Sequence, residues 1–255
     1  MGVLLYSAIG VITILVLVKG YPYLYLVVRS KAEIARMNNS CLATGNITSD
    51  IAAARDGHAN VYLIKGAGGH IAIDAGEKAK VLESSLAQLG ILPEEVTNVF
   101  LTHTDFDHCG AIEIFKNARV HIAKAEEWLI DGSMKRTFTK YRLRWNNKLR
   151  VPYRTMEDGE VLAIGDRKVQ SILTPGHTPG SMCFLIDDKY LFTGDTIALE
   201  DGRFQRFVDL FTMDGDENVK SIHKLVRTLE GKNVEYVFSA HHGYVDDYHS
   251  AAEGW

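Results

Sequence analysis

Four side chains that can bind a metal ion lie within six residues of one another: His103, Asp105, Asp107 and His108. They directly follow an apolar run from Asn98 to Leu101. In an extended loop, alternate residues point the same way, so His103 and Asp105 can converge on one ion. Asp107 and His108 can turn toward a second. Imidazole nitrogen and carboxylate oxygen are the ligands that zinc, iron and manganese favour. The spacing therefore predicts a metal site that could activate water for hydrolysis.

This run resembles the H-x-H-x-D-H signature of the metallo-β-lactamase superfamily, with a carboxylate in place of the second histidine (H-x-D-x-D-H). Asp74, in an Asp-Ala-Gly sequence, resembles the early structural aspartate of that family. Further motifs in chain order resemble its remaining metal ligands: His177, Asp195 and His242. The resemblance extends over residues 58–245 and is specific for fold and metal site, but it does not identify a substrate.

The resemblance implies a binuclear centre. One metal would be bound by His103, Asp105 and His177, and the other by Asp107, His108 and His242. Asp195 would bridge the two ions together with a water or hydroxide. Asp107 would also be catalytic, orienting the nucleophile or carrying a proton to the leaving group. His241 could support the site or exchange with His242, which we favour because a glycine follows it, as in the family pattern.

The carboxylate of Asp105 departs from the family pattern. It brings three carboxylates to the pair of ions, which should weaken their Lewis acidity and shift preference from zinc toward iron or manganese. We therefore expect two divalent metal ions as cofactors, with zinc first and iron or manganese as alternatives. The remaining histidines are expected to be ordinary surface or packing residues: His58, His70, His121, His223 and His249.

The elements that must position these residues follow from short hydrophobic patterns. β-rich runs, a glycine hairpin at residues 66–69 and two helical patterns at residues 78–89 and 218–229 predict a mixture of helices and strands. Further strands are expected at residues 98–101, 119–122, 161–164, 168–173, 181–186, 190–193 and 236–239, and a short helix at residues 124–129. The resemblance adds the architecture, an α+β fold built as a four-layer αββα sandwich.

The N-terminal residues predict a membrane anchor. Residues 1–18 contain no charged side chain, and 18 residues at about 1.5 Å each can cross the hydrocarbon core. No basic residue precedes the run and no small-x-small pattern follows it, which favours an uncleaved, single-pass helix over a signal peptide. We expect an anchor at residues 1–28, a linker at 29–55 and a catalytic domain at 56–255. The basic residues that follow the span place that domain in the cytoplasm.

A basic segment at residues 135–154 carries eight lysine or arginine residues and no acidic residue, with four interleaved aromatic side chains. Three interpretations remain open: a cationic lid for an anionic substrate, a solvated face, and a surface that lies against anionic lipid headgroups. The mild net charge of −4 argues against a general nucleic-acid binder. The three cysteines are too few and odd in number for a disulfide framework, and we expect reduced thiols.

These observations favour a metal-dependent hydrolase that cleaves an ester, thioester or lactone bond in a small-molecule substrate, anionic if the basic segment faces it. A phosphodiesterase or nuclease is the first alternative, supported by the basic segment. An iron-dependent oxidoreductase of the same fold is the second, supported by Asp105. A binding protein with a structural metal site is weaker, because two ligand triads and a bridging carboxylate exceed what a structural site needs. The oligomeric state is not predicted.

Overall fold

The computed structural model describes residues 24–137 and 144–255, which divide into two compact units at residues 36 and 37. The described part of the first unit is helical, and this helix extends to residue 40. Within the described ranges no helix is long and apolar enough to cross a membrane. The span expected at residues 1–18 lies outside these ranges, so the anchor stays a prediction.

The second unit contains two main β-sheets. The seven-stranded sheet has the order β1-β2-β3-β4-β5-β6-β9. Its strands are β1 Gly45–Asn46, β2 Ile51–Asp56, β3 Ala59–Gly66, β4 Gly69–Ile73, β5 Val96–Phe100, β6 Arg119–Ala123 and β9 Tyr153–Met156. The six-stranded sheet has the order β10-β11-β12-β13-β16-β17. Its strands are β10 Val161–Ile164, β11 Arg167–Leu173, β12 Met182–Ile186, β13 Tyr190–Phe192, β16 Tyr236–Ser239 and β17 Gly243–Val245.

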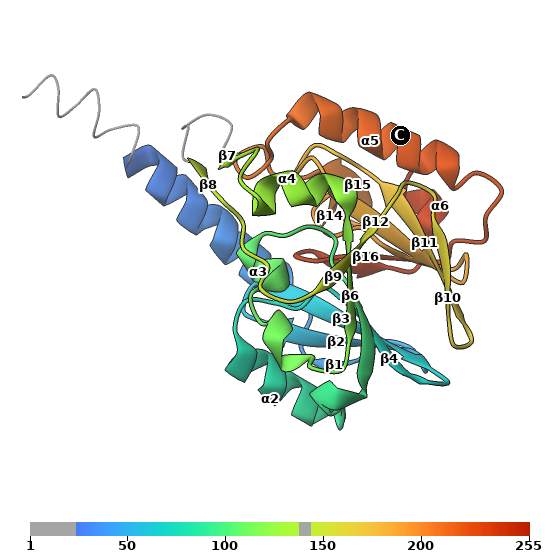
Figure 1. The fold of residues 1–255 in the computed structure, drawn as a ribbon. Coiled ribbons are helices and arrows are strands. Elements are labelled where there is room, and N and C mark those ends of the chain that lie inside the picture. The colour runs from blue at the N-terminus through green and yellow to red at the C-terminus, as the bar shows by residue number, and fades with distance from the viewer. Residues whose placement is uncertain (1–23, 138–143) are drawn as a thin grey trace, which may run out of the picture. The chain divides into compact units, whose positions relative to one another are not determined.

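Two short hairpins and several helices complete the unit (Figure 1). The hairpins pair β7 Arg136–Thr137 with β8 Arg144–Trp145, and β14 Ile197–Glu200 with β15 Arg203–Arg206. The α-helices are α2 Ala79–Leu89, α3 Phe106–Cys109, α4 Glu127–Ile130, α5 Gly215–Thr228 and α6 Tyr248–Ala251. Three 3-10 turns are η1 Pro93–Glu95, η2 Ile112–Ile114 and η3 Lys124–Glu126.

The hydrophobic core confirms the predicted αββα sandwich. Along β3, Val61 and Leu63 belong to a cluster that contains Leu82 and Leu86 of α2, while Tyr62 and Ile64 belong to a cluster shared with the second sheet. This alternation is what a strand covered on both faces requires. A third cluster packs α5 against the outer face of the second sheet. Helices therefore cover the outer faces of two stacked sheets (Figure 1).

The predicted linker at residues 29–55 is wrong. A helix occupies residues 24–40, and β2 is a buried strand that pairs along its whole length with β3. Three consecutive alanines, Ala52 to Ala54, fill the centre of β2 and are buried. Alanine is depleted in strands, and this segment lacks the run of β-branched and aromatic residues that predicted the other strands. The first sheet begins before the boundary at residue 56 that the sequence suggested.

Candidate metal centre

Parallel pairing brings the loops that carry the metal-binding residues together. β4 pairs with β5 in parallel, and β13 pairs with β16 in parallel. Asp74 follows β4, the His103 loop follows β5, Asp195 follows β13, and His241 follows β16. Because parallel strands end at the same edge of a sheet, these loops meet at one edge of the sandwich. The loop after β11 adds His177.

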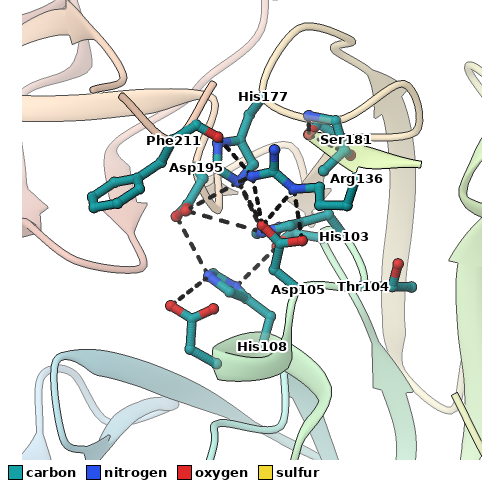
Figure 2. Close-up of polar contacts among 12 residues, drawn as sticks. His103, Thr104, Asp105, His108, Arg136, His177, Ser181, Asp195 and Phe211 are labelled. Carbon is teal, nitrogen blue, oxygen red and sulfur yellow. Dashed lines mark hydrogen bonds and ion pairs between the residues drawn. The ribbon is translucent and has the colours of Figure 1, made fainter. Parts of the chain in front are cut away.

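The first ion position lies between His103 and His177. Their Nε2 atoms are 3.1 Å apart, although the two side chains come from different sheets. Asp195 Oδ2 lies 3.5 Å from His177 Nε2 and 4.0 Å from His103 Nε2. All three residues are buried. Figure 2 shows these side chains pointing toward a common centre.

The second ion position lies between His108 and His241, whose Nε2 atoms are 3.3 Å apart. Asp195 Oδ1 lies 3.6 Å from His108 Nε2 and 3.2 Å from His241 Nε2. Asp107 Oδ2 approaches the same two nitrogens at 3.9 and 3.6 Å. Asp195 thus presents one oxygen to each position, the arrangement expected of a bridging carboxylate.

These distances fit metal ions. A tetrahedral ion with bonds of 2.0–2.2 Å separates its donor atoms by about 3.3–3.6 Å. The two Nε2 atoms of each histidine pair are 3.1 and 3.3 Å apart in a buried site. In each pair the two nitrogens face a shared point, as ligands of one ion do. The described residues contain three groups able to hold an ion: His103–His177–Asp195, His108–Asp195–His241 and His58–Asp107–His241. The residues present therefore fit two metal ions.

The adjacent histidines after β16 differ in their place, and we had favoured His242 as the ligand. His241, and not His242, contributes to the ion-binding groups. His241 Nδ1 lies 2.6 Å from the carbonyl oxygen of His58, which fixes the ring and leaves Nε2 to face the site. The ring of His242 instead meets the edge of Phe207, with centroids 6.1 Å apart. A following glycine does not determine which of two neighbouring side chains turns inward.

His58 belongs to the site, contrary to the expectation of a surface or packing histidine. It lies in the tight turn between β2 and β3, and its Nε2 is 3.2 Å from Asp107 Oδ2. Its ring stacks on His241 with centroids 5.5 Å apart and planes 12° apart. No local pattern marked it, because β2 was not expected and the turn that carries it was therefore not placed.

Asp105 has a partner that the sequence analysis did not find. Arg136 Nε lies 2.8 and 2.9 Å from the two Asp105 carboxylate oxygens, and its Nη2 lies 2.7 Å from Oδ2. Asp105 Oδ2 also faces the first ion position, 3.2 Å from His177 Nε2 and 3.6 Å from His103 Nε2. Asp105 is not in any of the three ion-binding groups found among the described residues, so its role as a ligand stays a prediction.

Electrostatics keep the carboxylates ionised. Burial alone would raise the pKa of Asp195, but His241 and His108 outweigh it and hold that pKa well below its usual value. Burial likewise opposes ionisation of Asp105, whose pKa is nevertheless held well below its usual value by Arg136. Burial, and then Arg136, lower the pKa of His177 to about 4. At pH 7 this imidazole is therefore neutral and can offer a lone pair to a cation.

Two buried carboxylates outside the ion positions hold the ligand loops. Asp74, at a left-handed φ of 65°, accepts hydrogen bonds from the Thr102 amide and hydroxyl and lies 2.9 Å from His108 Nδ1. This contact orients His108 with Nε2 toward the site. Glu126 is fully buried and accepts bonds from Thr104 N at 2.8 Å, the hydroxyls of Thr104 and Thr178, and Gly180 N at 3.1 Å. It therefore links the loops on either side of the site.

The sequence profile of the Metallo-beta-lactamase superfamily matches residues 54–241, which is most of the chain. Curated relatives include an acyl-coenzyme A thioesterase of Homo sapiens, 31% identical over 54% of this chain and 58% of the relative. A hydroxyacylglutathione hydrolase of Rhizobium etli is 35% identical over 53% of this chain and 46% of the relative. A probable polyketide biosynthesis zinc-dependent hydrolase of Bacillus velezensis is 32% identical over 51% and 50%. The match spans about half the length of these relatives.

Solved structures agree in fold. A B3 metallo-beta-lactamase with an active-site glutamic acid superposes with a TM-score of 0.64 at 21% identity, covering 87% of this chain and 90% of that one. A metallo-beta-lactamase family protein from Thermus thermophilus gives 0.54 at 25% identity, covering 76% and 72%. The family match, the fold and the two histidine pairs around Asp195 together identify the chain as a member of the metallo-beta-lactamase superfamily.

Proposed function

We propose that this chain hydrolyses a thioester, or a related ester or lactone, with a water held between two zinc ions. The observation that carries the proposal is Asp195, whose two oxygens each face one pair of histidines. The names of the relatives support the bond class: an acyl-coenzyme A thioesterase, a hydroxyacylglutathione hydrolase and an N-acyl homoserine lactonase of Agrobacterium fabrum. All three names describe cleavage of a bond to an acyl carbon.

The chain's own residues would divide the work. Zinc, when bound, lowers the pKa of its water and polarises the carbonyl oxygen of the substrate. His103, His177, His108 and His241 would hold the two ions, with Asp195 between them. Asp107 Oδ2 faces the second position and could orient the attacking water or accept its proton. His58 Nε2, at 3.2 Å from that oxygen, would restrain the carboxylate.

The charge of the site supports zinc. Asp105 adds a third carboxylate, which by itself favours a harder ion. Arg136, fully buried against it, adds a compensating positive charge. The total then equals that of a site with two carboxylates and no arginine. This balance weakens the argument for iron, and with it the oxidoreductase alternative that rested on Asp105 alone.

Elemental analysis of the full chain, purified in detergent without added metal, tests the metal assignment. We expect about two zinc ions per chain and no visible absorption band. Iron with a charge-transfer band would favour the oxidoreductase, and folded protein that binds no metal on titration would refute the proposal.

A substrate panel tests the reaction. It should contain acyl-coenzyme A and acyl-glutathione thioesters, an acyl homoserine lactone and a phosphodiester. We expect hydrolysis of one or more acyl compounds, lost in Asp195→Asn and retained in Asp188→Asn, which alters ion pairs with Lys168 and Lys232 away from the metal centre. Cleavage of the phosphodiester alone would favour the phosphodiesterase alternative.

A further inference from the structure

Among the basic residues of the segment at 135–154 that the structure describes, Arg136 alone is buried, and it lies in the metal centre. Arg136, in β7, is 0% exposed, while the neighbouring basic residues Lys135, Arg144, Lys148 and Arg150 are exposed. The segment was expected to face substrate, solvent or lipid, and for the exposed residues that question stays open. Arg136 is distinct, because its side chain reaches Asp105 and His177 (Figure 2).

Every nitrogen of the Arg136 guanidinium has an acceptor. Nε and Nη2 make a bidentate contact with the Asp105 carboxylate. Nη2 also donates to the carbonyl oxygen of Phe211 at 2.6 Å, and Nη1 donates to that of Thr137 at 3.1 Å. These contacts fix the orientation of the planar guanidinium, and its bidentate contact in turn fixes the rotamer of Asp105. Asn147 Nδ2, 3.1 Å from Asp105 Oδ1, adds a further contact.

Arg136 and Asp105 lie beside the first ion position. Asp105 Oδ2 lies between Arg136 Nη2 at 2.7 Å and His177 Nε2 at 3.2 Å. Nη2 itself is 3.2 Å from His177 Nε2. Without Asp105, the guanidinium would be an uncompensated cation beside the first position and would repel a second positive charge. Without Arg136, the site would carry an excess buried negative charge, and the Asp105 side chain would lose its bidentate contact and keep the contact with Asn147.

We propose that Arg136 and Asp105 act as one coupled unit that replaces a neutral histidine at the first metal position. Arg136 is the positioning residue: it aims Asp105 Oδ2 at the ion and cancels the added charge. This inference rests on the proposed function, since it assumes that two ions bind. It also accounts for the histidine-to-aspartate departure, because a carboxylate at this place needs a cation that a histidine does not.

A double-mutant cycle on the full chain in detergent tests the coupling. The variants are Asp105→His, Arg136→Gln and the combination, and the readout is zinc affinity by competition with a chromophoric chelator. We expect each single variant to bind one of its two zinc ions about 10- to 100-fold more weakly, as changes to groups that orient ligands do. The combined variant, with no excess buried charge, should recover to within about tenfold of the unaltered chain.

Controls separate this role from a purely structural one. Arg203→Gln removes an exposed arginine from its ion pair with Glu253 and should leave both zinc affinities unchanged. A pair that only stabilises the fold predicts lower melting temperatures in the single variants with unchanged zinc affinity. Where a single variant does not fold, Arg136→Lys replaces it; this variant keeps the charge but loses the bidentate grip, so weaker binding of one zinc is again expected.

Two results would overturn the inference. One is a single Asp105→His variant that binds both zinc ions as tightly as the unaltered chain, since Arg136 would then be no obstacle to a histidine. The other is a folded double variant that fails to recover the second ion. Failure of the proposed function is distinguishable from either, because the unaltered chain itself would then bind no pair of zinc ions.

Discussion

At the scale of single residues, the adjacent pair His241 and His242 offers a direct test of the metal centre. His241→Ala removes a nitrogen that lies 3.2 Å from Asp195 and 3.3 Å from His108. We expect it to lose one zinc ion and to lower kcat/KM by about 100-fold or more, since even groups behind a ligand contribute 10- to 100-fold. His242→Ala removes a ring that packs against Phe207 and belongs to none of the ion-binding groups found among the described residues, so its zinc content should be unchanged. The opposite pattern would restore His242 as the ligand.

Residue spacing and the family resemblance together predicted much of this site. The loop after β5 and the motifs at His177 and Asp195 lie where the spacing and the family resemblance placed them. Three participants were missed or misassigned: His58, Arg136 and His241. For each of them, the fold decides whether the side chain points into the site, and no local sequence pattern encodes that direction. Arg136 in particular was one of eight basic residues in its segment, and no local pattern separates it from the described basic residues that are exposed.

At the scale of elements, Glu126 joins parts of the molecule that supply different ligands. It lies in η3, after β6, and accepts hydrogen bonds from Thr104, between two site residues, and from Gly180 beyond His177. Glu126→Gln replaces one acceptor oxygen with a donor that faces other donors. We expect a loss of about 1–3 kcal/mol in the free energy of unfolding, the cost of unsatisfied buried groups, together with weaker zinc binding.

Glu127→Gln, at the next position, is the matched control, because its carboxylate contacts only the hydroxyl of Tyr153 at 3.3 Å in the contacts described. Denaturant unfolding and chelator competition would compare the two. Equal stability and equal zinc affinity in both variants would show that Glu126 does not support the ligand loops.

Element prediction succeeded where β-branched, aromatic and other apolar residues form short continuous runs. Runs rich in valine, isoleucine and aromatic residues became β3, β5, β12 and β16. It failed at β2, whose alanines pack on both faces without a β-branched signal. Hydrophobic periodicity also did not predict the order of the layers. It indicates helices and strands, but not which faces of the sheets pack against each other. That part came from the family resemblance and was confirmed by the three separate core clusters.

At the scale of the whole molecule, residues 1–18 remain a predicted anchor. We expect the full chain to stay with membranes through alkaline carbonate extraction. Ile12→Asp combined with Leu15→Asp should release it, because each central aspartate costs about 2.5–3.5 kcal/mol on insertion. Ile34→Asp, at an exposed position beyond the predicted anchor, is the control and should stay membrane-bound. Extraction of the unaltered chain by carbonate would contradict the anchor.

The metal centre also spans the two sheets, so metal removal should affect the stability of the whole catalytic unit. His103 and His108 follow a strand of the first sheet, while His177, Asp195 and His241 follow strands of the second. Ions bound between them stabilise only the assembled sandwich. At a zinc concentration about 1,000-fold above Kd, this linkage contributes about 4 kcal/mol.

For a domain of this size, about 4 kcal/mol corresponds to a rise in Tm of about 8–16 °C. Thermal unfolding of the chelated and zinc-loaded chain would measure the difference. Asp195→Asn removes the carboxylate that faces both positions, so its melting temperature should depend much less on zinc. Equal melting temperatures with and without zinc in the unaltered chain would mean that the histidines of the two sheets do not share bound ions.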